Sequence, residues 1–248
     1  MPVRNEFSWE VTPSVPGQWH ATIAQNGFTV TIQSDSILAT IEETGHEEEQ
    51  RNQAEDIVAN LLREIGLLEQ IRFSKRLNSI AQFDPKAQTR SIRTFIKGER
   101  LTLRGDCADT RVEAADGTVR DSRIERLQKL QLCADLQAKS EVLRTLTDYL
   151  LEYHADPEKK LFPIYDVIEE VQSVLGGRLH EADGLRISKK AIDRVTKIVN
   201  REPIRTGRHR GARVEALRDI TPKESRICET AAVLIIERYR KLVQDGKA

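Results

Sequence analysis

The chain is poor in cysteine, and it lacks a glycine-rich phosphate loop, a long apolar run and an excess of charge of either sign. Its 248 residues include only three cysteines, Cys107, Cys133 and Cys228, with no CxxC pair among them. So sparse a set is typical of reduced thiols in a cytoplasmic protein and excludes a zinc or haem site held by cysteine pairs. No dinucleotide-binding fingerprint occurs either. We therefore predict a cytoplasmic protein with no cysteine-held metal and no bound cofactor.

The charge balance limits the kinds of partner that the chain is expected to bind. Lysine and arginine number 39, aspartate and glutamate number 39, and the formal net charge is zero. A neutral chain is not a general nucleic-acid coat protein, although a local basic site can still bind nucleic acid. No apolar run approaches the roughly 18–20 residues that span a membrane, and the start of the chain lacks the apolar core of a signal peptide. We predict a soluble globular protein with no membrane partner.

The first 117 residues alternate between apolar and polar positions, which predicts β-strands. The pair Asn26-Gly27 lies between two alternating runs and predicts a tight hairpin. A helical pattern from about Glu47 to Ile65 interrupts the alternation, and Gly66 is expected to end that helix. We predict a domain over residues 1–117 with an antiparallel sheet or sandwich of about seven to nine short strands and one helix. The alternating positions are Phe7, Trp9 and Val11; Trp19, Ala21 and Ile23; Phe28, Val30 and Ile32; Ile37, Ala39 and Ile41; Ile71 and Phe73; Ile92, Thr94 and Ile96; Leu101 and Leu103; and Val112 with Ala114.

After Gly117 the apolar period changes to 3.6, which predicts a helical domain over residues 118–248 and an α+β protein overall. Four helices are expected in an antiparallel bundle. The first runs from Asp121 or Ser122 to about His154, and the second carries apolar residues from 164 to 175 and ends at Gly176-Gly177. The third starts at the cap Ser188, and the fourth starts at the capping box Thr221-Pro222-Lys223-Glu224 and runs almost to the end of the chain.

The loop between the third and fourth helices concentrates cations. From Asn200 to Arg213 it carries five arginines and one histidine against the single acid Glu202. Guanidinium groups bind phosphate oxygens in pairs, and an imidazole can exchange a proton near neutral pH. Metal-free RNA cleavage would need those two abilities together. The site residues that we predict are His209 for proton transfer, Arg205 and Arg208 beside it in catalysis, Arg201, Arg210, Arg213 and Asn200 for phosphate binding, and Glu169 or Glu170 to orient the arginines.

Two other interpretations stay open at this stage. The loop can be a solvated connector whose arginines pair with acids elsewhere on the surface. His180, with Glu181 and Asp183, forms a weaker candidate for a metal site.

Three stretches of the helical half resemble the HEPN superfamily, and in particular its Apea-like and MauJ-like members. They are the run from Phe162 to Glu170, Leu175-Gly176-Gly177, and the run from Gly207 to Gly211. The resemblance covers residues 121–245. It implies a four-helix HEPN-like domain and, in many members, a metal-independent endoribonuclease of toxin–antitoxin or antiviral systems with its active site across a homodimer. Other members are binding or regulatory modules.

The spacing in this chain differs from the family pattern. The arginine and histidine of the family stand farther apart than Arg205 and His209, and closer than Arg201 and His209. From the arginines and histidine of the loop together with the resemblance, we still predict an RNA-binding protein or metal-independent endoribonuclease of a defence or stress system. The alternative is a non-catalytic module that binds a nucleotide, a phosphorylated ligand or a protein partner, and a third option is a structural role for the arginines. The resemblance assigns residues 1–117 to sensing or to binding a protein partner.

Overall fold

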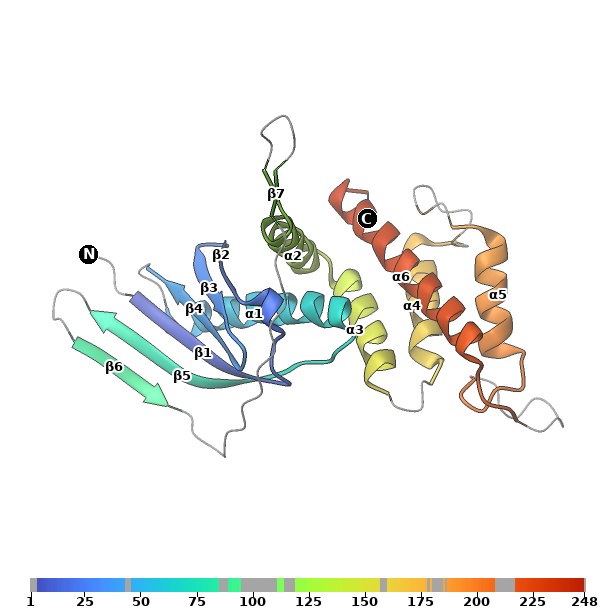
Figure 1. Cartoon of the computed structure of the whole chain (residues 1–248), viewed down its shortest axis with the longest axis horizontal. Coiled ribbons are helices and arrows are strands. Elements are labelled where there is room, and N and C mark those ends of the chain that lie inside the picture. The colour runs from blue at the N-terminus through green and yellow to red at the C-terminus, as the bar shows by residue number, and fades with distance from the viewer. Residues whose placement is uncertain are drawn as a thin grey trace. The chain divides into compact units, whose positions relative to one another are not determined.

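The computed structural model describes residues 4–42, 46–84, 89–94, 111–113, 119–156, 160–177, 179, 185, 187–207 and 217–247. The chain forms two compact units. The first comprises Met1–Ile65 and Phe73–Asp135, and the second comprises Gly66–Arg72 and Leu136–Ala248. The class is α+β, as predicted, with an antiparallel sheet in the first unit and helices in the second (Figure 1). Gly117, where we placed the domain boundary, lies outside the described residues.

The first unit is built on an antiparallel sheet with the strand order β2-β3-β4-β1-β5-β6. Its strands are β1 (Arg4–Thr12), β2 (Ala21–Gln25), β3 (Phe28–Ile32), β4 (Ser36–Ile41), β5 (Ser74–Asp84) and β6 (Thr89–Thr94). The pair β7 (Arg111–Glu113) and β8 (Val119–Asp121) forms a separate two-stranded sheet. The alternating residues of β1, β3 and β4 bury one face of the sheet against helix α1 (Glu47–Glu69), which Figure 1 shows along that face.

The hairpin predicted at Asn26-Gly27 is confirmed. Gln25 pairs with Phe28, and the two turn residues have positive φ angles, 49° for Asn26 and 83° for Gly27. Positive φ at both central positions is what a two-residue turn between twisted strands requires.

Three local predictions in this half were wrong. Trp19 lies in the short 3₁₀ helix η1 (Gly17–Trp19), and β5 begins after Ile71 and Phe73. Gly66 does not end α1, which continues to Glu69 and is followed by Gln70 with a φ of 56°. A glycine inside a helix costs about 1 kcal/mol, and Leu67, the next residue, is partly buried against an apolar core. The strands expected at residues 101–103 lie outside the described residues.

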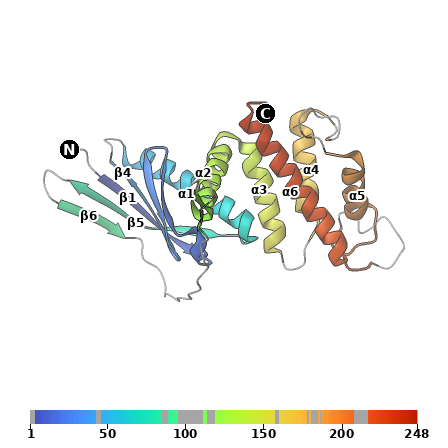
Figure 2. The ribbon, with the colours of Figure 1, turned by 45° about the horizontal axis from the view of Figure 1, so that its top comes forward.

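Four of the helices that the structure describes pack on the apolar core of the second unit (Figures 1 and 2). They are α3 (Glu141–Ala155), α4 (Phe162–Leu175), α5 (Lys189–Asn200) and α6 (Pro222–Gln244). The single helix expected from residue 121 to residue 154 is in fact two, α2 (Ser122–Lys139) and α3. Ser140 separates them because its backbone is extended (φ −132°, ψ 111°) and its hydroxyl accepts from the amide of Leu143 at 3.2 Å. A serine at this position caps a new helix rather than continuing the old one.

The other predicted helix ends are confirmed. Ser188 caps α5 by accepting from the amide of Ala191. Gly176 ends α4 in the left-handed region, with a φ of 67°. Thr221 and Glu224 form the reciprocal bonds of a capping box at the start of α6. The last of these ends fixes where the segment between α5 and α6 rejoins the helices.

Candidate functional site

A short stalk formed by residues 200–207 and 217–221 carries the arginine-rich loop. The amide of Arg205 donates to the carbonyl oxygen of Arg218 at 2.9 Å, and the amide of Arg218 donates to that of Pro203 at 2.8 Å. Ile204 forms a parallel bridge with Arg218, is 1% exposed and belongs to the apolar core. The two ends of the loop are therefore held together, and residues 208–216 lie between them in the chain.

The stalk is also anchored to the start of α4. The amide of Leu161, a buried residue just before this helix, donates to the carbonyl oxygen of Thr206 at 3.1 Å. Next to it, a Cβ on Gly207 would lie 3.0 Å from the carbonyl oxygen of Val199 and 3.1 Å from that of Ile204. Both oxygens belong to the backbone and cannot move aside as a side chain would. A side chain at this position would therefore require the backbone to shift by a few tenths of an ångström.

A bidentate ion pair joins the stalk to α6. Nη1 of Arg218 lies 2.8 Å from Oε2 of Glu224, and Nη2 lies 2.7 Å from Oε1. Nη2 also lies 3.5 Å from Oε2 of Glu202. The hydrogen bonds from Arg218, assisted by those from Thr221, lower the pKa of Glu224 to about 2 despite partial burial. The guanidinium of Arg218 is thus engaged by two carboxylates, and its main role is structural.

Two arginines of the predicted site lie at the surface. The side chain of Arg205 is 63% exposed, and its Nε lies 3.3 Å from Oδ1 of Asp219, which is itself 87% exposed. Arg201, the residue that follows α5, is exposed as well. Ion pairs between exposed groups are worth little in water and are screened by salt. The contact with Asp219 therefore leaves Arg205 able to exchange that partner for a phosphate.

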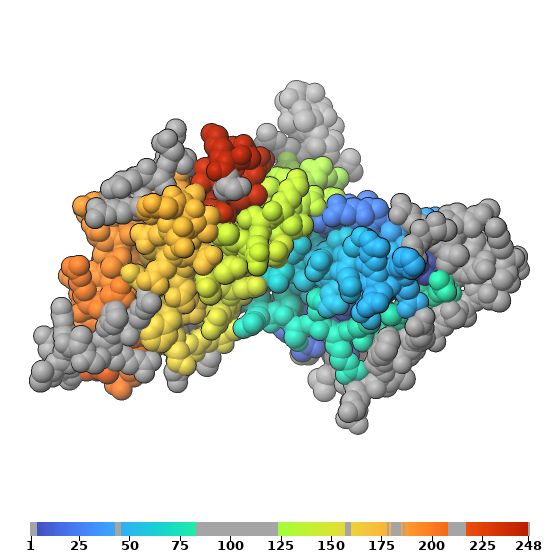
Figure 3. Space-filling model, turned by 180° about the vertical axis from the view of Figure 1, so that it is seen from behind, coloured from blue at the N-terminus to red at the C-terminus, as the bar shows by residue number. Residues whose placement is uncertain are grey.

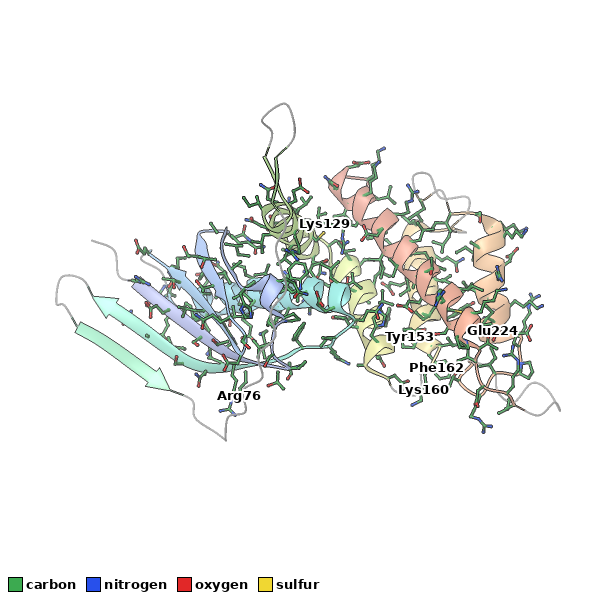
Figure 4. All side chains as sticks on the ribbon, in the orientation of Figure 1. Arg76, Lys129, Tyr153, Lys160, Phe162 and Glu224 are labelled. Atoms are coloured by element: carbon green, nitrogen blue, oxygen red, sulfur yellow. The ribbon has the colours of Figure 1, made fainter. Side chains whose placement is uncertain are left out.

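A hollow of about 320 Å³ lies between α5 and the beginning of α6. Its lining combines cations, carboxylates and two isoleucines: Arg194, Lys197, Ile198, Glu202, Thr221, Lys223, Glu224 and Ile227. Nζ of Lys197 lies 3.3 Å from Oε1 of Glu202, so both carboxylates of the hollow are engaged by cations. Figure 4 shows Glu224 at the N-terminal end of α6.

A second hollow, of about 330 Å³, lies between the end of α3 and the start of α4. Figure 4 labels two residues of its lining, Lys160 and Phe162, at the N-terminal end of α4. Three acids outnumber the two cations among its lining residues, which are Arg72, Glu152, Ala155, Asp156, Lys160, Phe162, Pro163 and Asp166. An anion would be less well placed there than beside α5.

Four residues of the predicted site, Arg208, His209, Arg210 and Arg213, lie outside the described residues. The catalytic role of His209 therefore stays a prediction. Asn200 is the last residue of α5, and its Oδ1 is buried without a hydrogen-bond partner within the described part of the chain. A buried amide oxygen with no donor costs free energy, which is consistent with a site that a ligand or a loop residue completes.

The two predicted orienting acids lie on α4. Glu169 is exposed. Glu170 adds to the effect of burial in raising the pKa of Tyr149 and of Tyr239. Its carboxylate is thus close to residues of α3 and α6, and its orienting role, like that of Glu169, stays a prediction.

The weaker metal candidate, His180 with Glu181 and Asp183, lies outside the described residues. Within the described ranges, no three histidine, cysteine or carboxylate side chains are grouped as metal ligands would be. Among the helices that the structure describes, none is long and apolar enough to cross a membrane.

Sequence reasoning missed the residues that build the stalk and the cations beside it. Arg218 stands outside the arginine-rich run, and its pairing with Glu224 bridges the loop to the next helix. Glu224 was identified only as half of a capping box. Arg194 and Lys197 belong to the exposed face of α5, where the pattern of apolar residues predicts only solvent contact.

No protein-family model, curated protein or solved structure matches this chain.

Proposed function

We propose that this chain binds the phosphate backbone of RNA through the loop from Asn200 to Arg213, within a helical domain of the HEPN type. The division of roles among the arginines carries the proposal. Arg218 is engaged by Glu224 and Glu202, whereas Arg201 and Arg205 are exposed on a stalk that backbone hydrogen bonds hold in place. Exposed guanidinium groups on a fixed base suit bidentate contacts with phosphate oxygens.

The arrangement of helices supports the domain type that the sequence suggested. Helices α3 to α6 share one core, and the arginine-rich loop lies in the chain directly before α6, the last of them. A four-helix unit with its cationic element before the final helix is the pattern that the resemblance implies.

The catalytic form of the proposal assigns proton transfer to His209, two residues after the anchored Gly207 in the chain. Cleavage without a metal needs a base for the 2′-hydroxyl, an acid for the leaving oxygen and cations around the phosphate. Arg205 and Arg208 would supply the cations. A homodimer would bring two copies of His209 together, one for each proton.

RNA binding is tested by fluorescence anisotropy with a labelled oligonucleotide over a range of salt concentrations. The variant Arg205→Ala/Arg208→Ala/Arg210→Ala should reduce the slope of log K against log salt by about 2, because each phosphate contact to a single strand contributes roughly 0.7. Wild type that does not bind, or a loop variant that binds as wild type does, would contradict the proposal.

Cleavage is tested with purified protein and cellular RNA in excess EDTA. Wild type should yield 2′,3′-cyclic phosphate ends, and His209→Ala should bind RNA and leave it intact. Binding without cleavage by the wild type identifies the non-catalytic module instead. Cleavage that persists in His209→Ala refutes the assignment of that histidine.

A further inference from the structure

Helix α5 carries a row of exposed cations that its own stability does not explain. The α5 stripe consists of Lys190, Arg194 and Lys197 on the helix and Arg201 at its C-cap. All four are exposed and stand at intervals of three and four residues, so they lie along one face. The opposite face is buried in the core through Ile192, Val195, Ile198 and Val199. Figure 3 shows the outer surface of α5, in orange, beside that of α4.

This distribution of charge is unfavourable for the helix alone. Like charges at i,i+3 and i,i+4 destabilise a helix by a few tenths of a kcal/mol for each pair. The α5 stripe contains three such pairs in succession, and Asp193 together with the contact of Lys197 with Glu202 offsets part of that cost. The first turn contains Lys189 and Lys190 and no acid, although the N-terminal end of a helix favours negative charge. A row of cations with these costs is typical of a surface that meets an anion along its length.

The α5 stripe leads directly into the loop of the proposed function. Its four residues span about 16 Å at a rise of 1.5 Å per residue. A stacked nucleic-acid strand presents a phosphate about every 3.4 Å, so this length faces about five phosphates. Arg201 is both the end of the α5 stripe and the first arginine of the loop.

The hollow beside the α5 stripe bears on the form of the nucleic acid. Arg194 and Lys197 contribute to its lining, together with Ile198 and Ile227. Its volume of about 320 Å³ is at the lower end of the roughly 300–1,000 Å³ range of ligand sites, which suits one base or nucleotide. Only an unstacked base can leave its strand and enter such a hollow, and single-stranded RNA offers unstacked bases whereas a duplex keeps them paired.

We infer that single-stranded RNA runs along α5, with its phosphates on the α5 stripe and one unstacked base in the hollow between α5 and α6. The inference rests on the proposed function and extends its site from the loop to the adjacent helix. It also specifies the substrate class, because a duplex cannot place a base in the hollow.

The test compares three variants of the full chain by anisotropy, with one RNA oligonucleotide single-stranded and annealed to its complement. The α5 variant replaces Lys190, Arg194 and Lys197 by alanine, and the loop variant is that of the proposed function. A matched control replaces three exposed lysines elsewhere, Lys129, Lys139 and Lys241, by alanine; Figure 4 labels Lys129 on α2. Circular dichroism establishes that each variant is folded.

Wild type should prefer the single strand. The α5 variant should bind it at least tenfold more weakly near 0.1 M salt and should lower the salt slope by about 2, while the control binds as wild type does. An α5 variant equal to the control, or a wild type that binds the duplex equally well, overturns the inference. Loss of binding in the loop variant alone would overturn the inference and leave the proposed function standing. No RNA binding by the wild type would overturn both.

Discussion

Helices α5 and α6 are neighbours on one core, yet their charges follow opposite rules. Helix α6 begins with a capping box, has Glu224 in its first turn and Lys241 in its last. Each charge stands at the end of the helix where the backbone dipole favours it. Helix α5 is capped by the hydroxyl of Ser188 alone, and its first turn carries two lysines and no acid. The charges named for α6 suit the dipole at both ends, whereas α5 has a favourable charge in its last turn, Lys197, and unfavourable ones in its first.

The comparison separates two kinds of arginine in the same region. Arg218 is tied to the N-terminal end of α6, because both carboxylate oxygens of Glu224 accept from it while Glu224 also completes the capping box. Arg201 and Arg205 belong with α5, on the exposed side. A cation engaged by buried or half-buried acids contributes to stability, and an exposed row of cations contributes to the field that attracts an anion.

The largest expected effect is on the α6 side. Glu224→Gln keeps an acceptor for the capping box but removes the charge that Arg218 contacts, so it should lower the free energy of unfolding by about 2 kcal/mol near neutral pH. Urea unfolding followed by circular dichroism measures it. Asp219→Asn, at an exposed carboxylate whose partner Arg205 is exposed as well, is the matched control and should cost less than about 1 kcal/mol. Equal losses would contradict the special role of Glu224.

The stability difference between wild type and Glu224→Gln should also depend on pH. The pKa of Glu224 lies at about 2 in the folded chain against an ordinary value of 4.5, mainly because Arg218 donates to it. Its contribution to stability is therefore complete above pH 4.5 and is lost as the pH falls through about 2. The difference between wild type and Glu224→Gln should shrink steadily over that interval. A difference that stays constant with pH would mean that the charge on Glu224 is not its source.

The two caps offer a smaller and symmetrical effect. Thr221→Ala and Ser188→Ala each remove a hydroxyl that accepts from an amide three residues on. Each should cost about 1 kcal/mol in urea unfolding. If Thr221→Ala lowered the free energy of unfolding as much as Glu224→Gln does, the cap rather than the ion pair would hold the N-terminal end of α6.

Local sequence signals predicted the parts of this fold that depend on neighbouring residues. The turn at Asn26-Gly27 and the helix end at Gly176 followed from the positive φ angles that these residue types accept. Ser140 was not predicted as a break, because apolar residues continue at helical spacing on both sides of it. A serine inside such a pattern can continue the helix or cap a new one, and the packing around α3 decides between these two outcomes.

The sequence predicted which residue types gather in this region, and it did not predict the role of each arginine. The sequence showed a local excess of arginine between two helices, which predicted an anion site there. It could not show that Arg218 is held by Glu224 and Glu202, since that pairing depends on how the stalk folds back. The α5 stripe was missed because its residues coincide with the solvent face of an amphipathic helix.

The smallest predicted effect is a change in the free energy of unfolding that has opposite signs in α5 and α6. Lys190→Glu places an acid in the first turn of α5 and replaces the like-charge pair with Arg194 by an opposite one. It also replaces the opposite-charge pair with Asp193 by a like one, so it should raise the free energy of unfolding by only about 0.3 kcal/mol. Lys241→Glu makes the same charge change in the last turn of α6, where it should lower the free energy by a similar amount. Unfolding midpoints in urea measure both, and RNA affinity measured beside them should fall for Lys190→Glu alone. A variant of α5 that became more stable while binding less RNA would show that its cations are kept for a ligand; midpoints that move in the same direction for both variants would remove the contrast between the helices.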